Sequence, residues 1–243
     1  MFSSNKMHWD FALILIFLGV AVPVLGRRRI RQLLDSPETS KPDRLSIYAS
    51  TIAFQWLATA IILWRTRAHG ISVTQLGLTI PKPGLAITVS IVLAALISVN
   101  QIYSLRRLAA TPPETQGLLP QLALKLFPQD DVEHLIFFAL VITVAMCEEF
   151  IYRGFVQRVL QDWFGGYVIA GVIGSAIFFA LAHLYQGRRG LLTTTIVGAL
   201  FCGVRAWTES LFPTSVAHFV ADFSLGMLAP AKLRRAEKEY TRK

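Results

Sequence analysis

The sequence has few charged residues and almost no cysteine. Only 16% of its 243 residues are charged, whereas soluble proteins average about a quarter. Hydrophobic residues make up 53%, and the mean hydropathy is +0.50. This composition excludes an ordinary water-soluble domain and predicts an integral membrane protein. The two cysteines, Cys147 and Cys202, lie in apolar runs without metal-ligand spacing, so we interpret them as packing residues.

Long apolar runs fill most of the chain. In chain order they cover residues 9–26, 45–64, 85–105, 135–160, 167–184, 191–204 and 211–229. None alternates like a strand, and the segments between them are too short for a separate core. We therefore expect residues 1–243 to form one all-α membrane domain, a polytopic bundle of about seven transmembrane helices. Residues 118–127, between prolines, are expected to form an interfacial helix.

The net charge of +9 indicates an orientation rather than a nucleic-acid partner. With the N-terminus outside and the C-terminus in the cytoplasm, most of the 24 lysines and arginines, Arg44 among them, fall on the inner side. The arginine run at 27–29 also argues that residues 9–26 are a retained span and not a cleaved signal. The cations are divided among short loops without a basic face, which disfavours nucleic acid. Their expected partner is the anionic surface of the lipid bilayer.

Three ionisable residues interrupt the fourth run. Glu149 and Arg153 are four residues apart and share a helix face, so they can form an ion pair. Glu148 points about 100° away and lacks that partner, so it can act as a general base if water reaches it. Ionisable groups within spans mark functional sites by default. The alternative is that all three form a buried polar clamp between helices.

Two further pairs carry the same spacing. Phe179 and His183 share a face of the fifth run, and His218 and Asp222 share a face of the seventh. A carboxylate at this spacing can orient an imidazole or accept its proton. A histidine at a helix end can also be merely interfacial, and the His218 and Asp222 pair can simply pin two helices together.

The depth of these residues can be compared along the chain. If the fourth and fifth spans form a hairpin near residues 165–166, Glu148 and His183 lie at similar depth and can face each other. His218 lies close to the start of its run and is expected nearer the outer side, unless that span begins deeper. Small residues of the fifth span, including Gly171 and Gly174, predict close helix packing inside the bundle.

The ordered set of motifs resembles the CPBP family, the intramembrane glutamic proteases that include type II CAAX prenyl endopeptidases and bacteriocin-processing or Abi proteins. The motifs are Glu148-Glu149-x-x-x-Arg153, Phe179-x-x-x-His183 and His218-x-x-x-Asp222. The resemblance implies catalytic helices within residues 133–228 and an enzyme in the bacterial cytoplasmic membrane. It also implies a membrane-anchored peptide or protein as substrate.

The resemblance implies a role for each position. Glu148 with His183 would activate a water that attacks a peptide carbonyl. His218 and Asp222 would stabilise the oxyanion.

The remaining motif residues would support the site: Glu149, Arg153 and Phe179. The prenyl proteases that the chain resembles carry Asn at the position of Asp222. An ionised Asp would repel an oxyanion, so Asp222 must be protonated or must orient His218, which then donates.

Three alternatives remain open at this point. The set Glu148, His183, His218 and Asp222 could bind Zn²⁺, but no HExxH motif is present, so a mechanism without metal or other cofactor is favoured. A serine protease is disfavoured because there is no GxSxG motif, and a cysteine protease because Cys147 points to a different helix face from Glu148. A transporter or scaffold that uses the charges structurally is disfavoured because the chain has no repeated halves.

Overall fold

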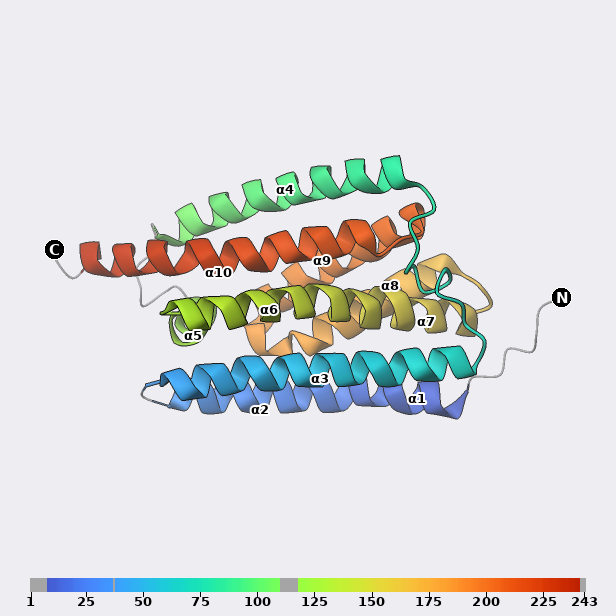
Figure 1. The fold of residues 1–243 in the computed structure, drawn as a ribbon, viewed down its shortest axis with the longest axis horizontal. Coiled ribbons are helices and arrows are strands. Elements are labelled where there is room, and N and C mark those ends of the chain that lie inside the picture. Colours follow the sequence, from blue (N-terminus) through green and yellow to red (C-terminus); the bar gives the residue numbers. More distant parts are fainter. Residues whose placement is uncertain (1–7, 37, 110–117, 241–243) are drawn as a thin grey trace.

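The chain folds into a bundle of helices that run roughly along one axis. The computed structural model describes residues 8–36, 38–109 and 118–240, and within these residues it contains helices, turns and bends but no strand. α10 ends at the opposite end of the bundle from the start of α1 (Figure 1). The predicted all-α membrane bundle is confirmed.

The elements follow the predicted apolar runs. Two of the helical rods are continuous, one made of α1, η1 and α2 and the other of α6, η3 and α7. The bounds are α1 Trp9–Ile16, η1 Phe17–Ala21, α2 Val22–Asp35, α3 Lys41–Ala68, α4 Pro83–Ala109, α5 Leu118–Leu126, α6 Asp131–Glu148, η3 Glu149–Val156, α7 Gln157–Trp163, α8 Val168–Ala182, η4 Leu184–Gln186, α9 Gly187–Thr208 and α10 Phe212–Tyr240. The helix predicted at 118–127 is therefore present as α5.

Five helices in the described residues are long and apolar enough to cross a bilayer. They are Trp9–Asp35, Lys41–Ala68, Pro83–Arg107, Asp131–Trp163 and Gly190–Thr208. α8 is apolar but has only 15 residues, fewer than the roughly 20 that a bilayer requires. The protein is an integral membrane protein, and the predicted number of seven crossings is not confirmed.

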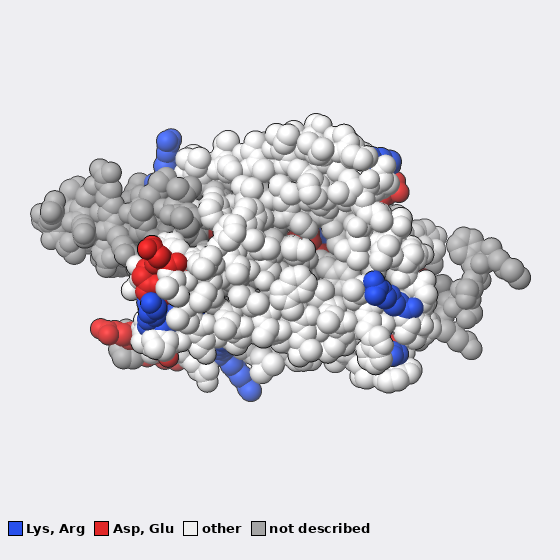
Figure 2. All heavy atoms as spheres, in the orientation of Figure 1, with Lys and Arg blue, Asp and Glu red and all other residues white. Residues whose placement is uncertain are grey.

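The outer surface of the bundle is apolar. Large side chains such as Trp9, Leu135 and Ile169 are more than two-thirds exposed, at 73%, 71% and 72%. On the face seen in Figure 2, charged side chains gather toward the two ends and uncharged atoms cover most of the middle. This distribution matches a protein whose middle is solvated by lipid.

The rod of α6, η3 and α7 lies at the centre of the bundle. α3 packs against α6, α10 packs against both α4 and α6, and α8 packs against η3, α7 and α9 (Figure 1). The core around η3 contains Phe150, Phe155 and Val156, which are buried. The rod of α6, η3 and α7 therefore packs against α3, α8 and α10 on different faces.

Two glycines of α8 permit the close packing predicted from the sequence. A Cβ atom on Gly171 would lie 2.6 Å from the carbonyl oxygen of Gln157, and one on Gly174 would lie 2.4 Å from Cδ1 of Leu160. Both neighbours belong to α7. Any larger residue at these positions would push α8 away from the central rod.

The segment at 69–82, which joins α3 to α4, enters the bundle and carries the start of α10 with it. Leu76 in this segment has no exposed surface, and its carbonyl oxygen lies 3.0 Å from the position of a Cβ on Gly154. The amide of Leu211 donates to the carbonyl of Gly77 at 2.8 Å. α10 therefore begins beside η3, deeper than a surface turn would place it.

This depth corrects the expectation that His218 lies near the outer side. Its span begins deeper in the bundle, which brings His218 to the level of Glu149. The sequence pattern did not reveal this, because an inserted loop has no apolar periodicity of its own.

Arg44 also differs from its interpretation as an orientation signal. Its Nη2 and Nε donate to Oε1 and Oε2 of Glu133 at 2.7 and 3.1 Å, and both side chains are buried. The pair joins α3 to the start of α6. A buried pair in this two-pronged geometry holds two spans in register.

Candidate active site

Glu149 lies at the centre of a buried charge cluster. Its Oε1 accepts from Nη1 of Arg153 at 3.0 Å and from Nδ1 of His218 at 2.8 Å. Glu149 and Arg153 have no exposed surface. The ion pair predicted from the four-residue spacing is present, and it is extended by a histidine from α10.

Aromatic rings surround the Arg153 guanidinium. Its Cζ lies 4.0 Å from the ring centre of Phe179 and 5.3 Å from that of Phe201. A cation over aromatic faces is stabilised when it is removed from water. The Phe179 ring also meets His218 edge-on, with centroids 6.2 Å apart. Phe179 of α8 thus contacts the charge cluster at two residues, Arg153 and His218.

Glu148 faces another direction from its neighbour, as the helix geometry predicts. Its Oε1 accepts from Nε2 of Gln55 on α3 at 3.0 Å. Its Oε2 is buried and has no hydrogen-bond partner among the described residues. Glu148 also lines a cavity of about 110 Å³, together with Tyr152, His183 and Tyr185.

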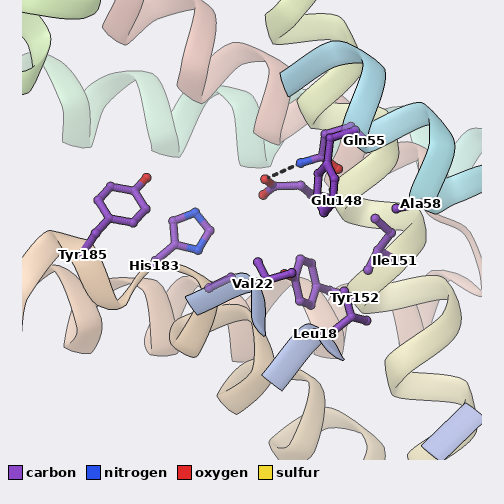
Figure 3. Close-up of a pocket in the computed structure, with 11 residues that line it drawn as sticks. Leu18, Val22, Gln55, Ala58, Glu148, Ile151, Tyr152, His183 and Tyr185 are labelled. Atoms are coloured by element: carbon purple, nitrogen blue, oxygen red, sulfur yellow. Dashed lines mark hydrogen bonds between the residues drawn. The ribbon is translucent and has the colours of Figure 1, made fainter. Parts of the chain in front are cut away.

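His183 ends α8 and turns its ring into the same cavity. Its Nδ1 lies 2.8 Å from the carbonyl oxygen of Phe179, so this nitrogen carries the proton and donates. In the neutral ring, Nε2 is then left as an acceptor. Figure 3 shows Glu148 and His183 on opposite sides of the cavity, with the carboxylate directed toward the ring. The predicted facing of these two residues is observed.

His218 and Asp222 form the third part of the site. Nε2 of His218 lies 3.6 Å from Oδ2 of Asp222, on the same face of α10. Both line a second cavity of about 1040 Å³, which Glu148 and His183 also line. The structure therefore brings all four residues proposed as catalytic around connected space.

The larger cavity extends from this cluster between α2, α3 and α5. Its wall is mostly apolar and includes Ile47, Leu122 and Phe137, whereas Arg29 and Asp43 lie farther along it. The cavity is thus long compared with the four-residue cluster at its end. It has room for an extended apolar or peptide segment.

Sequence reasoning missed two residues around Glu148. Gln55 is a lone amide in an apolar run 93 residues from Glu148, and no spacing rule connects the two positions. Tyr185 follows His183 by two residues and lines both cavities. Burial raises the pKa of Tyr185 to about 12, and the nearby Glu148 and Asp222 carboxylates act in the same direction. Its proximity to His183 in the sequence was the one available signal.

Among the described residues, no three or more His, Cys, Asp or Glu side chains form a group that could hold a metal ion. Cys147 and Cys202 are buried free thiols, which agrees with their interpretation as packing residues.

A protein-family model matches part of the chain. The family model described as type II CAAX prenyl endopeptidase Rce1-like matches residues 131–224, from the start of α6 to the middle of α10. No curated protein and no solved structure matches the chain. The matched segment contains every motif residue of the cluster described above. Residues 131–224 are therefore similar to the type II CAAX prenyl endopeptidases, in agreement with the resemblance to the CPBP family that the motifs indicate.

Proposed function

We propose that the protein is an intramembrane endopeptidase that hydrolyses a peptide bond of a membrane-associated protein or peptide. The observation that carries this proposal is the placement of Glu148 and His183 across one cavity, where the carboxylate has a buried oxygen without a hydrogen-bond partner among the described residues and the imidazole has a nitrogen left as an acceptor. A base and a second acceptor on either side of a water are the minimum needed to activate it. The family match supports protease activity in general.

The reaction begins with proton transfer from water. Oε2 of Glu148 accepts one proton while the water oxygen bonds to the carbonyl carbon, and Nε2 of His183 accepts the other hydrogen bond of that water. Glu148 then delivers the proton to the leaving amine as the C–N bond breaks. The products are a carboxylic acid, which keeps the second proton of the water until it passes to the released amine or to solvent, and an amine, and Glu148 returns to its ionised form.

His218 stabilises the oxyanion that forms when water attacks. Its Nδ1 donates to Glu149, so Nε2 is the nitrogen that remains for the substrate. An imidazolium placed between Glu149 and Asp222 can donate from both nitrogens. Nδ1 then donates to Glu149 and Nε2 to the oxyanion, while Asp222, whose Oδ2 lies 3.6 Å from Nε2, helps to orient the ring and need not contact the oxyanion.

Glu149, Arg153 and Phe179 hold these groups in place. Glu149 fixes His218 directly, and Arg153 supplies the counter-charge within the aromatic enclosure of Phe179. Such a buried network is strongly destabilised when one charge is removed. Its role is preorganisation of the donors for the transition state.

The substrate would occupy the cavity of about 1040 Å³, entering between α2, α3 and α5. The mostly apolar wall fits a segment that arrives from the bilayer. The cationic segments support an orientation in which the C-terminus faces the cytoplasm across a bacterial inner membrane, under the positive-inside rule. Residues 133–228 would supply the catalytic helices of a single membrane domain.

Comparative membrane proteomics tests this function even while the substrate is unidentified. Cells would carry the wild type, Glu148→Gln or His183→Ala. Matched controls are Asp162→Asn, which changes an exposed carboxylate paired with Arg158, and His134→Ala, which changes an exposed histidine. We expect a peptide tail that persists only with Glu148→Gln and His183→Ala, at protein levels equal to those of the controls.

Persistence of processing in both variants would contradict the protease assignment. If the variants fold and localise normally and the membrane proteomes are identical, the buried charges serve a transporter or a scaffold instead. The control variants separate loss of a catalytic group from general damage to a charged membrane protein.

A further inference from the structure

The carboxylate of Glu148 is fixed by a residue outside the family-matched segment. Gln55 lies in the middle of α3 and is only 9% exposed. Its Nε2 donates to Oε1 of Glu148 at 3.0 Å. Figure 3 shows this bond on the side of the carboxylate away from His183. The family match covers residues 131–224 and therefore says nothing about α3.

This contact divides the two oxygens of Glu148 between two tasks. Oε1 is occupied by the amide, whereas Oε2 is buried without a partner among the described residues. A donor on one oxygen restricts rotation of the carboxyl group and keeps the other oxygen available for water. Because the amide is neutral, it does this without the full counter-charge that Arg153 gives to Glu149.

We propose that Gln55 is a positioning residue that holds Glu148 in the conformation needed to activate water. This inference rests on the proposed function. Gln55 acts through Glu148 and is not assigned a contact with the reacting atoms.

Several titratable or charged groups surround Glu148. They are Cys147, Glu149, Tyr152 and Arg153 on its own rod, His183 and Tyr185 after α8, and His218 and Asp222 on α10. In the smaller cavity, of about 110 Å³, the lining residues from η1, α2 and α3 are uncharged, and Gln55 is the amide among them. A change at Gln55 therefore alters one hydrogen bond and leaves this charge set intact.

Gln157 provides a matched control. It is a fully buried glutamine whose Nε2 also donates at 3.0 Å, but its acceptor is the backbone carbonyl of Cys202. Its Oε1, like that of Gln55, has no partner among the described residues. Gln55→Met and Gln157→Met thus remove equivalent buried hydrogen bonds, and only the first removes one from the proposed base.

The test measures cleavage of a synthetic peptide spanning the cleavage site that the proteomic comparison identifies. Purified wild type, Gln55→Met, Gln55→Glu, Gln157→Met and Glu148→Gln would be compared in detergent micelles. We expect Gln55→Met to lower kcat about 10- to 100-fold, the effect of losing a hydrogen bond to a charged group, with little change in KM. Gln55→Glu, which replaces the amide donor with a second carboxyl group, should lower kcat by at least as much.

Gln157→Met should lower the Tm comparably but leave kcat at its wild-type value. If Glu148→Gln is inactive while Gln55→Met and Gln55→Glu behave as the wild type, only the positioning role is wrong. If Glu148→Gln remains active, the proposed function fails and the role of Gln55 fails with it. Equal losses of kcat for Gln55→Met and Gln157→Met would also overturn the proposal.

Discussion

Nδ1 of His218 donates to Oε1 of Glu149 at 2.8 Å, although the two residues are 69 positions apart. The bond joins α10 to the central rod inside the membrane. The same oxygen also accepts from Arg153 at 3.0 Å. One carboxylate oxygen therefore connects the counter-charge of the site to the histidine that faces the larger cavity. Replacing Glu149 should therefore lower both stability and activity, whereas replacing Glu148 should lower activity with little effect on stability.

Replacing Glu149 with Gln should destabilise the fold. The change leaves the Arg153 cation buried without its counter-charge, which typically costs about 3–5 kcal/mol. We expect a marked decrease in Tm, measured by thermal unfolding in detergent micelles, and a loss of activity as His218 is released. Glu209→Gln is the control, because Glu209 is exposed and pairs with Lys82 at the surface; its Tm should match the wild type. A Glu149→Gln protein as stable as this control would refute the structural role of the cluster.

A single methyl group on Gly171 should disturb the packing of α8. The added Cβ would lie 2.6 Å from the carbonyl oxygen of Gln157, so α8 must move. Overpacking of this kind costs about 1–3 kcal/mol, and displacement of α8 also moves His183. Gly203→Ala on α9 is the control, because its Cβ meets no atom within 4 Å. We expect lower Tm and activity for Gly171→Ala alone, and equal Tm values for both variants would argue against the close contact.

Tyr185 should remain a neutral phenol throughout the working pH range. Burial raises its pKa to about 12, above the ordinary value of about 10, so the phenolate does not form until pH approaches 12. The alkaline limb of kcat/KM should therefore have the same midpoint in wild type and Tyr185→Phe between about pH 7 and 10. A limb near pH 10 that disappears in Tyr185→Phe would show that the hydroxyl ionises at its ordinary pKa.

Chelation should not abolish cleavage. The proposed mechanism activates water with Glu148 and His183, and no step requires a metal ion. Incubation of the purified enzyme with EDTA or 1,10-phenanthroline should leave kcat within about twofold of the untreated value, measured on the peptide used for Gln55. Loss of activity that zinc restores would instead assign the four residues to a metal site.

Much of the site follows from local spacing in the sequence. The four-residue intervals from Glu149 to Arg153 and from His218 to Asp222 predict pairs that the structure contains. These pairs depend only on helix geometry, which is the same wherever the helix lies. The facing of Glu148 and His183 also follows, because a hairpin fixes equal depths on two neighbouring helices.

Other contacts depend on tertiary packing and could not be predicted. The bond from Gln55 to Glu148 requires α3 to lie against α6 in one rotation and register. The depth of His218 depends on insertion of the 69–82 segment, where Leu76 and Gly77 contact η3 and the start of α10. The sequence also predicts regular α-helix over Glu149–Val156, whereas the structure has π-helical turns there. Such turns are frequent at functional sites, but no sequence period marks them.

The role of Glu148 as the general base is tested most directly by the kcat of Glu148→Gln, measured beside the wild type and Asp162→Asn on the peptide identified by proteomics. Removal of a general base typically costs about 10²- to 10⁴-fold. We predict this loss in kcat, with KM and Tm close to those of the wild type, because Gln preserves the shape of the side chain. A Glu148→Gln enzyme with kcat within about fivefold of the wild type would contradict the assignment of Glu148 as the base.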